Sequence, residues 1–223
     1  MERIHPEGFF EAVLPGRSRL FPYTLQVTTH DGVNYAGEDP YRFPPVLSDL
    51  DEHLFREGTH YRIYHRLGAH LCELEGVRGV SFAVWAPSAE RVSVVGDFNA
   101  WDGRVHPMRA RGGSGVWEIF LPALGSGEFY KFELRDQHGN THVKIDPYAT
   151  AFQTRPETAC ITQADSEFAW DDAAWLEERA QADWSHQPLS VYEVHLSSWQ
   201  RSADGNFLGY REIAERLVAA SVA

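Results

Sequence analysis

The stretch Arg91-Val-Ser-Val-Val-Gly-Asp-Phe-Asn-Ala-Trp-Asp-Gly103 decides how the rest of the sequence is interpreted. Val92 and Val94 point to one side of this stretch and the residues between them to the other, which is the period of a strand in a two-layer sheet. Glycine and aspartate then end the strand, and a turn-rich loop follows. Trp101 stands in that loop. Its indole can either cap the hydrophobic core or lie flat against a molecule from solution, and both interpretations stay open at this point.

The composition is that of a globular protein of 223 residues, long enough for one large domain or two small ones. Hydrophobic residues make up 43% of the chain, yet no apolar run approaches the roughly 20 residues that span a bilayer. The N-terminus lacks the charged-then-apolar pattern of a secretory signal. Cys72 and Cys160 lie far apart, without the spacing of a disulfide framework or a zinc site. We therefore predict a cytoplasmic protein with reduced thiols.

The charge balance narrows the range of partners. The 32 acidic and 20 basic residues give a formal net charge of -12, and no block of lysine or arginine occurs. A polyanion would be repelled, so we predict that neither nucleic acid nor an anionic membrane is a partner. A neutral polymer such as a polysaccharide would meet no such repulsion.

Residues 1–56 are predicted to form a partial β-module and a linker helix. Alternating apolar residues and a glycine-containing turn predict a β-hairpin over residues 20–35. Prolines make residues 38–45 an extended connector. Ser48, with an acidic residue three positions later, starts a predicted helix that Gly58 ends.

Residues 57–184 are predicted to form the main domain, with a short helix over residues 61–67 and a connecting helix that begins at Trp170. Between these helices, short strand patterns alternate with turn residues, which is typical of an immunoglobulin-like antiparallel β-sandwich. Trp85 and Trp117 fall within strand patterns and are predicted to be core residues. The strands are expected near residues 80–84, 92–95, 116–121, 128–134 and 141–144.

Residues 185–223 follow a different pattern. Residues 189–196 are nearly continuously apolar, which is typical of a strand buried in a parallel sheet. A helix follows, in which Tyr210, Ile213 and Leu217 form one stripe. Strand, loop and helix make one βα unit, so the predicted fold is mainly β with a terminal βα unit.

Carboxylate and histidine clusters are the candidates for chemistry, but their spacing argues against it. The pairs Asp171-Asp172 and Glu177-Glu178 are adjacent on a predicted helix, where neighbouring side chains diverge by about 100°. Three histidines recur every five residues, which neither aligns on a helix face nor builds a metal cage; they are His60, His65 and His70. We therefore predict no catalytic residue, no metal site and no cofactor within this chain.

Motifs in order along the chain resemble the N-terminal part of bacterial glycogen branching enzymes, the 1,4-α-glucan branching enzymes of glycoside hydrolase family 13. They are similar to that family's linker between its first two modules, to its carbohydrate-binding module of family 48, and to the first strand of its catalytic (β/α)₈ barrel. The linker motifs are residues 39–43, 54–60 and 67–70, the module motifs are residues 80–87, 96–101 and 130–132, and the barrel motif is residues 191–199.

The resemblance implies a transferase of glycogen biosynthesis. The family cuts an α-1,4-glucan, holds the cut chain covalently on an aspartate and transfers it to a 6-hydroxyl, which makes an α-1,6 branch. Such a barrel takes about 250 residues and sets its catalytic groups at the ends of several strands. The family's catalytic residues would lie beyond residue 223, so the resemblance implies that this chain is a truncated and inactive fragment whose own contribution is glucan binding.

The resemblance also implies the sugar contacts. In family-48 modules a tryptophan and a lysine at the positions of Trp101 and Lys131 contact starch-like sugar, and Asn99 is a weaker candidate. Lys131 alternates with its aromatic neighbours and should therefore point to the opposite side of its strand. A second aromatic residue of the strongest binders has no match at residues 139–142. The implied partner is glycogen or another α-1,4-glucan, bound by a monomer.

Two other functions stay open. The chain could be a stand-alone α-glucan-binding regulatory module, or a fragment of a debranching isoamylase or trehalose-releasing hydrolase, which also carry a family-48 module. The βα unit favours an enzyme, and the linker motifs between residues 39 and 70 favour branching. Without the rest of a barrel, the stripe of the βα unit would leave an exposed apolar patch; its members are Val191, Val194, Ile213 and Leu217.

Overall fold

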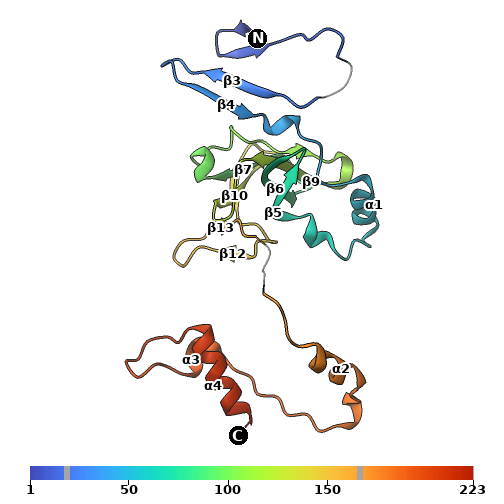
Figure 1. Ribbon diagram of the computed structural model, residues 1–223, viewed down its shortest axis with the longest axis vertical. Coiled ribbons are helices and arrows are strands. Elements are labelled where there is room, and N and C mark those ends of the chain that lie inside the picture. The colour runs from blue at the N-terminus through green and yellow to red at the C-terminus, as the bar shows by residue number, and fades with distance from the viewer. Residues whose placement is uncertain (18–20, 165–167, 223) are drawn as a thin grey trace. The chain divides into compact units, whose positions relative to one another are not determined.

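The computed structural model describes residues 1–17, 21–164 and 168–222. The chain divides into two compact units, Met1–Ser166 and Glu167–Ala223 (Figure 1). The named strands of the described residues all lie in the first unit.

Two antiparallel hairpins open the first unit. β1 (Glu2–His5) pairs with β2 (Phe9–Glu11), a hairpin that the sequence analysis does not predict. β3 (Thr24–Thr28) pairs with β4 (Asn34–Glu38). This second hairpin confirms the one predicted over residues 20–35, with a return strand that continues to Glu38; Leu20, where the prediction begins, lies outside the described residues.

The connector after β4 is extended at Asp39 and Phe43, as predicted, but not in the three residues between them. It forms a 3₁₀ turn, η1 (Pro40–Arg42), because the carboxylate of Asp39 accepts a hydrogen bond from the backbone N–H of Tyr41 at 2.9 Å. Proline at the first position of such a turn is tolerated, since its missing N–H would have no partner there.

Two helices are predicted in the segment before the sandwich, and the structure has a helical turn or helix at both places. α1 (Asp49–Glu57) confirms the predicted helix: Ser48 caps its N-terminus, and Gly58 ends it in the left-handed region at φ 73°. The helix predicted over residues 61–67 is shorter, a single 3₁₀ turn, η2 (Ile63–His65).

Two antiparallel sheets confirm the predicted β-sandwich (Figure 1). The first sheet has the strand order β5-β6-β9-β8. In the second, β10 pairs with β7 along one edge and with β11 and β13 along the other, and β12 completes the sheet. The first sheet comprises β5 (Gly68–Leu74), β6 (Val77–Trp85), β8 (Arg109–Ala110) and β9 (Val116–Pro122). The second comprises β7 (Ala89–Gly96), β10 (Phe129–Asp136), β11 (Thr141–Lys144), β12 (Ala151–Phe152) and β13 (Cys160–Ile161).

The core lies between these sheets and follows the period of 2 along the strands. Alternate apolar side chains of β6 and β9 meet alternate side chains of β7 and β10, and all are almost completely buried. The largest is Tyr130, whose hydroxyl donates to Asp146 Oδ2 at 2.7 Å. The cluster includes Val80, Phe82, Val84, Val92, Val94, Ile119, Leu121, Tyr130, Phe132 and Cys160.

The two tryptophans predicted as core residues differ. Trp117 packs against the core and donates its indole N–H to Ala86 O at 3.1 Å. Trp85 is 56% exposed, so the prediction is wrong for this residue. Trp85 is the last residue of β6 and alternates with the buried Val84, which places it on the outer face of the first sheet.

The second unit contains helices α2 (Ala173–Gln181), α3 (Leu196–Trp199) and α4 (Tyr210–Val222) and a 3₁₀ turn, η5 (Trp184–His186). α2 confirms the predicted connecting helix, and α4 confirms the helix of the predicted βα unit. Within the predicted stripe of α4, Ile213 is buried whereas Tyr210 is 82% exposed.

The strand of the predicted βα unit is not formed. Residues 187–195 have no regular secondary structure, and Leu189 and Val191 are 78% and 80% exposed. A parallel strand satisfies its backbone N–H and C=O groups only through neighbouring strands. The described part of the second unit holds no named strand to pair with, and the sandwich strands do not include this segment.

Candidate functional site

The loop that carries Trp101 begins where β7 ends. Gly96 pairs with Tyr130 of β10, and a Cβ atom added to this glycine would lie 2.2 Å from Phe129 O and 2.5 Å from the ring of Phe98. Only glycine allows this close approach. A 3₁₀ turn, η3 (Asp97–Asn99), follows and turns the chain away from the sheet.

Asn99 is a buried residue that holds the loop together. Its Oδ1 accepts a hydrogen bond from Gly96 N at 2.9 Å, and its Nδ2 donates to Val94 O at 2.9 Å. The same Nδ2 lies 3.0 Å from His106 Nδ1. The side chain is only 8% exposed, so its amide groups serve the loop itself. The sugar contact predicted for Asn99 stays a prediction, and the geometry favours a role in shaping the loop.

Trp101 stands on a constrained backbone with part of its indole in solvent. Both Ala100 and Trp101 have positive φ, 52° and 60°, which non-glycine residues adopt rarely. The backbone N–H of Trp101 donates to Gly96 O at 2.9 Å, and its indole N–H donates to Asp97 Oδ1 at 2.7 Å. The side chain is 39% exposed and is absent from the buried cores of the sandwich. This geometry favours an indole that can lie flat against a molecule from solution over one that caps the hydrophobic core. The exposed indole face is called the platform below.

Lys131 lies on β10 between two buried aromatic residues, Tyr130 and Phe132, and therefore points to the outer face of the second sheet, as predicted. Its Nζ donates to Thr158 Oγ1 at 2.8 Å. Thr158 is exposed and lies just before β13. No local sequence pattern marks Thr158, because only the pairing of β13 with β10 brings it to the lysine.

The loop that carries Trp101 approaches the outer face of the second sheet, the face on which Lys131 lies. Glu133 follows Lys131 by two residues on β10, so both side chains point outward. A Cβ atom added to Gly103 would lie 2.0 Å from Glu133 Oε1, so the loop just after Trp101 passes directly over this face. The carboxylate of Glu133 is held by Arg91, whose guanidinium donates to Oε1 at 2.7 Å.

The arrangement suits binding and offers no reaction centre. An indole face can cover the apolar C–H face of a sugar ring, while an ammonium and a hydroxyl can bond to ring hydroxyls. Among the described residues, no group of three or more histidine, cysteine or acidic side chains could hold a metal ion. Cys72 and Cys160 are free, and burial raises the pKa of the Cys160 thiol.

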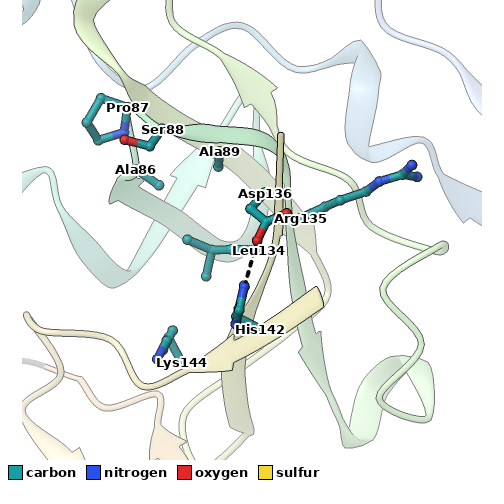
Figure 2. A pocket seen from close by; sticks show the side chains of 9 residues that line it. All are labelled: Ala86, Pro87, Ser88, Ala89, Leu134, Arg135, Asp136, His142 and Lys144. Atoms are coloured by element: carbon teal, nitrogen blue, oxygen red, sulfur yellow. Dashed lines mark hydrogen bonds and ion pairs between the residues drawn. The ribbon is translucent and has the colours of Figure 1, made fainter. Parts of the chain in front are cut away.

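A shallow hollow of about 210 Å³ lies at the other end of the same strands (Figure 2). It lies where β7 begins and β10 ends, whereas Trp101 follows the end of β7, roughly 25 Å away along an eight-residue strand. His142 Nε2 at its edge lies 3.0 Å from Asp136 Oδ2. Trp101 and Lys131 do not line the hollow; its lining residues are Ala86, Pro87, Ser88, Ala89, Leu134, Arg135, Asp136, His142 and Lys144.

Comparison with protein families identifies the class of the sandwich first. Residues 66–149 match the family "Carbohydrate-binding module 48 (Isoamylase N-terminal domain)". This range runs from just before β5 to just after β11 and includes both Trp101 and Lys131. The sandwich is therefore a carbohydrate-binding module of family 48. Residues 1–41 match a second family, "alpha-1,4-glucan branching enzyme GlgB, N-terminal domain".

Several bacterial proteins are similar to this chain over nearly its whole length. The chain is 51% identical over 219 residues to the 1,4-alpha-glucan branching enzyme GlgB of Methylococcus capsulatus, covering 98% of this chain and 30% of the relative. It is 53% identical over 219 residues to the enzyme of the same name from Rubrobacter xylanophilus, with the same coverage. The chain belongs to the bacterial 1,4-α-glucan branching enzyme family and corresponds to its N-terminal part, which confirms the resemblance seen in the motifs. It spans about 30% of the length of these relatives.

A solved structure, PulA from Klebsiella oxytoca, is 29% identical over 44% of this chain and 9% of its own chain, with a TM-score of 0.36. A superposition this loose supports no argument about function.

Proposed function

We propose that this chain supplies α-glucan binding to a 1,4-α-glucan branching enzyme of glycogen biosynthesis, through Trp101, Lys131 and Thr158. The observation that carries the proposal is the partly exposed indole of Trp101 on a family-48 module whose second sheet bears the exposed Lys131–Thr158 pair on its outer face. A glucose ring could lie on the indole while the ammonium and hydroxyl bond to its hydroxyls. The formal charge of -12 opposes polyanions but not a neutral glucan.

Affinity electrophoresis tests this proposal. In a native gel that contains glycogen, we expect the parent chain to be weakly retarded and Trp101→Ala to migrate as in a gel without glycogen. Trp170→Ala is the matched control, because Trp170 is 78% exposed and lies in the second unit. Its retardation should equal that of the parent. If Trp101→Ala is retarded as strongly as the parent, Trp101 is not the glucan contact.

The chain transfer itself is proposed to need residues outside this chain. The chain spans about 30% of the length of its branching-enzyme relatives, and a retaining mechanism requires two carboxylates about 5–5.5 Å apart that face one substrate. We therefore expect the chain alone to leave the iodine colour of amylose unchanged over a time in which a full-length relative lowers it. A fall in absorbance with the purified chain, abolished by heating, would contradict this assignment.

A stand-alone α-glucan-binding module is the second candidate. One observation favours it: the strand that would begin a barrel is not formed within residues 189–196. The relatives weigh against it, because the identity of 51% extends over 98% of the chain and so includes the second unit. A protein with only a binding role would need no counterpart of that unit.

We further propose that the whole protein acts as a monomer in the cytoplasm, with no nucleic-acid or membrane partner. The net negative charge supports the absence of these two partners, since nucleic acids and anionic membranes are polyanionic and would be repelled. Within the described residues, no helix combines the length and the apolar character required to cross a membrane. Light scattering coupled to size exclusion of the full-length protein tests the oligomeric state: a dimer mass at low micromolar concentration would contradict it.

A further inference from the structure

The loop that carries Trp101 has an unusual backbone conformation at two consecutive residues. Ala100 and Trp101 occupy the left-handed region in succession, at φ 52° and 60°, although neither is glycine. L-residues adopt this region at a cost, and such conformations persist only where the surroundings over-determine them. Residues with such a strained backbone cluster at ligand-binding sites, where the surrounding structure holds them in place.

Asp97 holds both the backbone and the side chain of this turn. It directly follows Gly96, which is fixed by pairing with Tyr130 of β10. Its backbone carbonyl accepts a hydrogen bond from Ala100 N at 3.3 Å, and its Oδ1 accepts one from the indole Nε1 of Trp101 at 2.7 Å. A hydrogen bond to an ionised carboxylate is about twice as strong as one between neutral groups. The indole plane is thus tied to the rigid end of β7.

We infer that Asp97 is a positioning residue for glucan binding, which fixes the indole of Trp101 in the orientation that receives a sugar ring. The inference rests on the proposed function of Trp101. An exposed tryptophan without this bond would sample several rotamers, and ordering it on binding would weaken affinity. Since the indole N–H is already occupied by Asp97, Trp101 offers the ligand only its apolar face. Selection among ring hydroxyls is then left to Lys131 and Thr158.

Two substitutions separate the bond from the charge. Asp97→Ala removes the acceptor, whereas Asp97→Asn keeps a side-chain oxygen that can still accept from the indole. With β-cyclodextrin as the probe and calorimetry on the full chain, we expect Asp97→Ala to weaken binding about 2- to 10-fold. Asp97→Asn should bind like the parent. Equal losses in both variants would overturn a positioning role and assign the effect to the negative charge.

Fluorine NMR provides a readout that loss of stability would not move. In protein labelled with 5-fluorotryptophan, the Trp101 resonance is identified by its absence in Trp101→Phe. We expect one narrow resonance in the parent and in Asp97→Asn, and a shifted, exchange-broadened one in Asp97→Ala. The other tryptophan resonances should keep their positions, which shows that the fold is intact. An unchanged Trp101 resonance in Asp97→Ala would overturn the inference even in the absence of ligand.

Asp102 supplies the matched control. It is a second carboxylate in the same loop, but its side chain is bound to Arg104 rather than to Trp101. Asp102→Ala should leave both the affinity and the Trp101 resonance as in the parent. If the parent itself shows no affinity for β-cyclodextrin, the proposed function fails while the resonance still tests the indole restraint. If the parent binds and Asp97→Ala binds equally well, the positioning role alone fails.

Discussion

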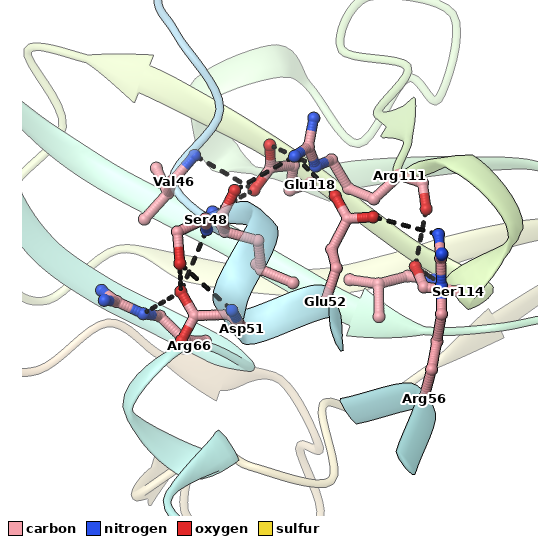
Figure 3. A network of polar contacts seen from close by, with 11 residues as sticks. Val46, Ser48, Asp51, Glu52, Arg56, Arg66, Arg111, Ser114 and Glu118 are labelled. Atoms are coloured by element: carbon pink, nitrogen blue, oxygen red, sulfur yellow. Dashed lines mark hydrogen bonds and ion pairs between the residues drawn. The ribbon is translucent and has the colours of Figure 1, made fainter. Parts of the chain in front are cut away.

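Asp51 shows how one carboxylate ties two segments together (Figure 3). Burial alone would raise its pKa, but hydrogen bonds from Ser48 and His60 and the charge of Arg66 outweigh burial and hold the pKa at about 2. Ser48 Oγ donates to Asp51 Oδ2 at 2.7 Å, and Arg66 Nε donates to the same atom at 3.1 Å. His60 Nε2 lies 2.9 Å from Oδ1. The N-terminus of α1 is thereby fastened to the chain that leads into β5.

A pH dependence follows from the lowered pKa of Asp51. Because the carboxyl pKa is lower in the folded state than its ordinary value of 3.8, the stabilisation is complete above about pH 4 and is lost as the pH falls toward 2. The shift corresponds to roughly 2–3 kcal/mol. Urea unfolding of the first unit at pH 6 and pH 2.5 should show that Asp51→Asn lowers the free energy of unfolding at pH 6 and by much less at pH 2.5. Asp171→Asn, which lies in the second unit, should leave the unfolding of the first unit unchanged. An equal deficit for Asp51→Asn at both pH values would contradict the assignment.

Glu118 performs a similar task deeper in the structure. This residue of β9 is 2% exposed, and its Oε2 accepts hydrogen bonds from Val46 N at 3.2 Å and Leu47 N at 2.9 Å. Arg111 lies 3.4 Å from Oε1 and also pairs with Glu52 of α1 at 2.6 Å (Figure 3). Burial raises the pKa of Glu118. The charged pair orients the segment before α1, and its backbone N–H groups find partners on the sheet.

At the scale of elements, α1 behaves as part of the sandwich. Its partly buried Phe55 packs on the cluster of Leu47, Leu67, Ala83 and Val116, which lies on the outer face of the first sheet. The domain boundary predicted between residues 56 and 57 stays a prediction, and we propose that the linker helix folds with the sandwich rather than with the preceding hairpins.

The C-terminal cap of α1 makes a direct prediction about stability. Gly58 has φ 73° and no atom within 4 Å of an added Cβ, so Gly58→Ala tests backbone strain alone. We expect a loss of about 1 kcal/mol in the free energy of unfolding, measured by urea denaturation. Gly113→Ala is the control, because Gly113 also has open space but no left-handed backbone. It should be neutral or slightly stabilising; equal losses in both variants would contradict the strain argument.

Residues 189–196 do not form the strand that their sequence pattern predicts. Their apolar run predicts a buried strand, but a strand of a parallel sheet depends on partners that the run itself does not contain. α4 forms from the same region because every hydrogen bond of a helix is internal to the segment. Local pattern therefore predicts the helix correctly and the strand incorrectly.

For the molecule as a whole, the second unit leaves apolar side chains in solvent. Leu189, Val191 and Tyr192 are 78%, 80% and 61% exposed. The apolar patch predicted for the stripe of the βα unit is thus confirmed for Val191, whereas Ile213 is only 5% exposed and the prediction is wrong there. Exposed apolar clusters of this kind promote association.

Self-association of the isolated chain should depend on that patch. We expect light scattering to rise with concentration for the parent chain and to fall when Leu189 and Val191 are both replaced by lysine. Val33→Lys is the control, because Val33 is 55% exposed but lies in the turn between β3 and β4. If Val33→Lys suppresses scattering as strongly as the double replacement, added positive charge rather than the patch is responsible.

Much of the fold and part of the site could be predicted from the sequence, for a physical reason. The alternation around Val92 and Val94, the Ser48 cap and the Gly58 stop are local, because each depends on residues within a few positions. The motif that ends in Trp101 marks the platform in the same way. These signals predicted the antiparallel sandwich, α1 and the outward strand position of Lys131.

Only the tertiary structure decided the rest, because the remaining features depend on pairings between distant segments. Thr158 reaches Lys131 only when β13 pairs with β10. The outward position of Trp85, the engagement of Asn99 within its own loop and the bond from Trp101 to Asp97 all follow from how neighbouring strands and turns pack. The segment 189–196 remained without a strand partner, since an apolar run specifies that a strand would be buried but not what would bury it.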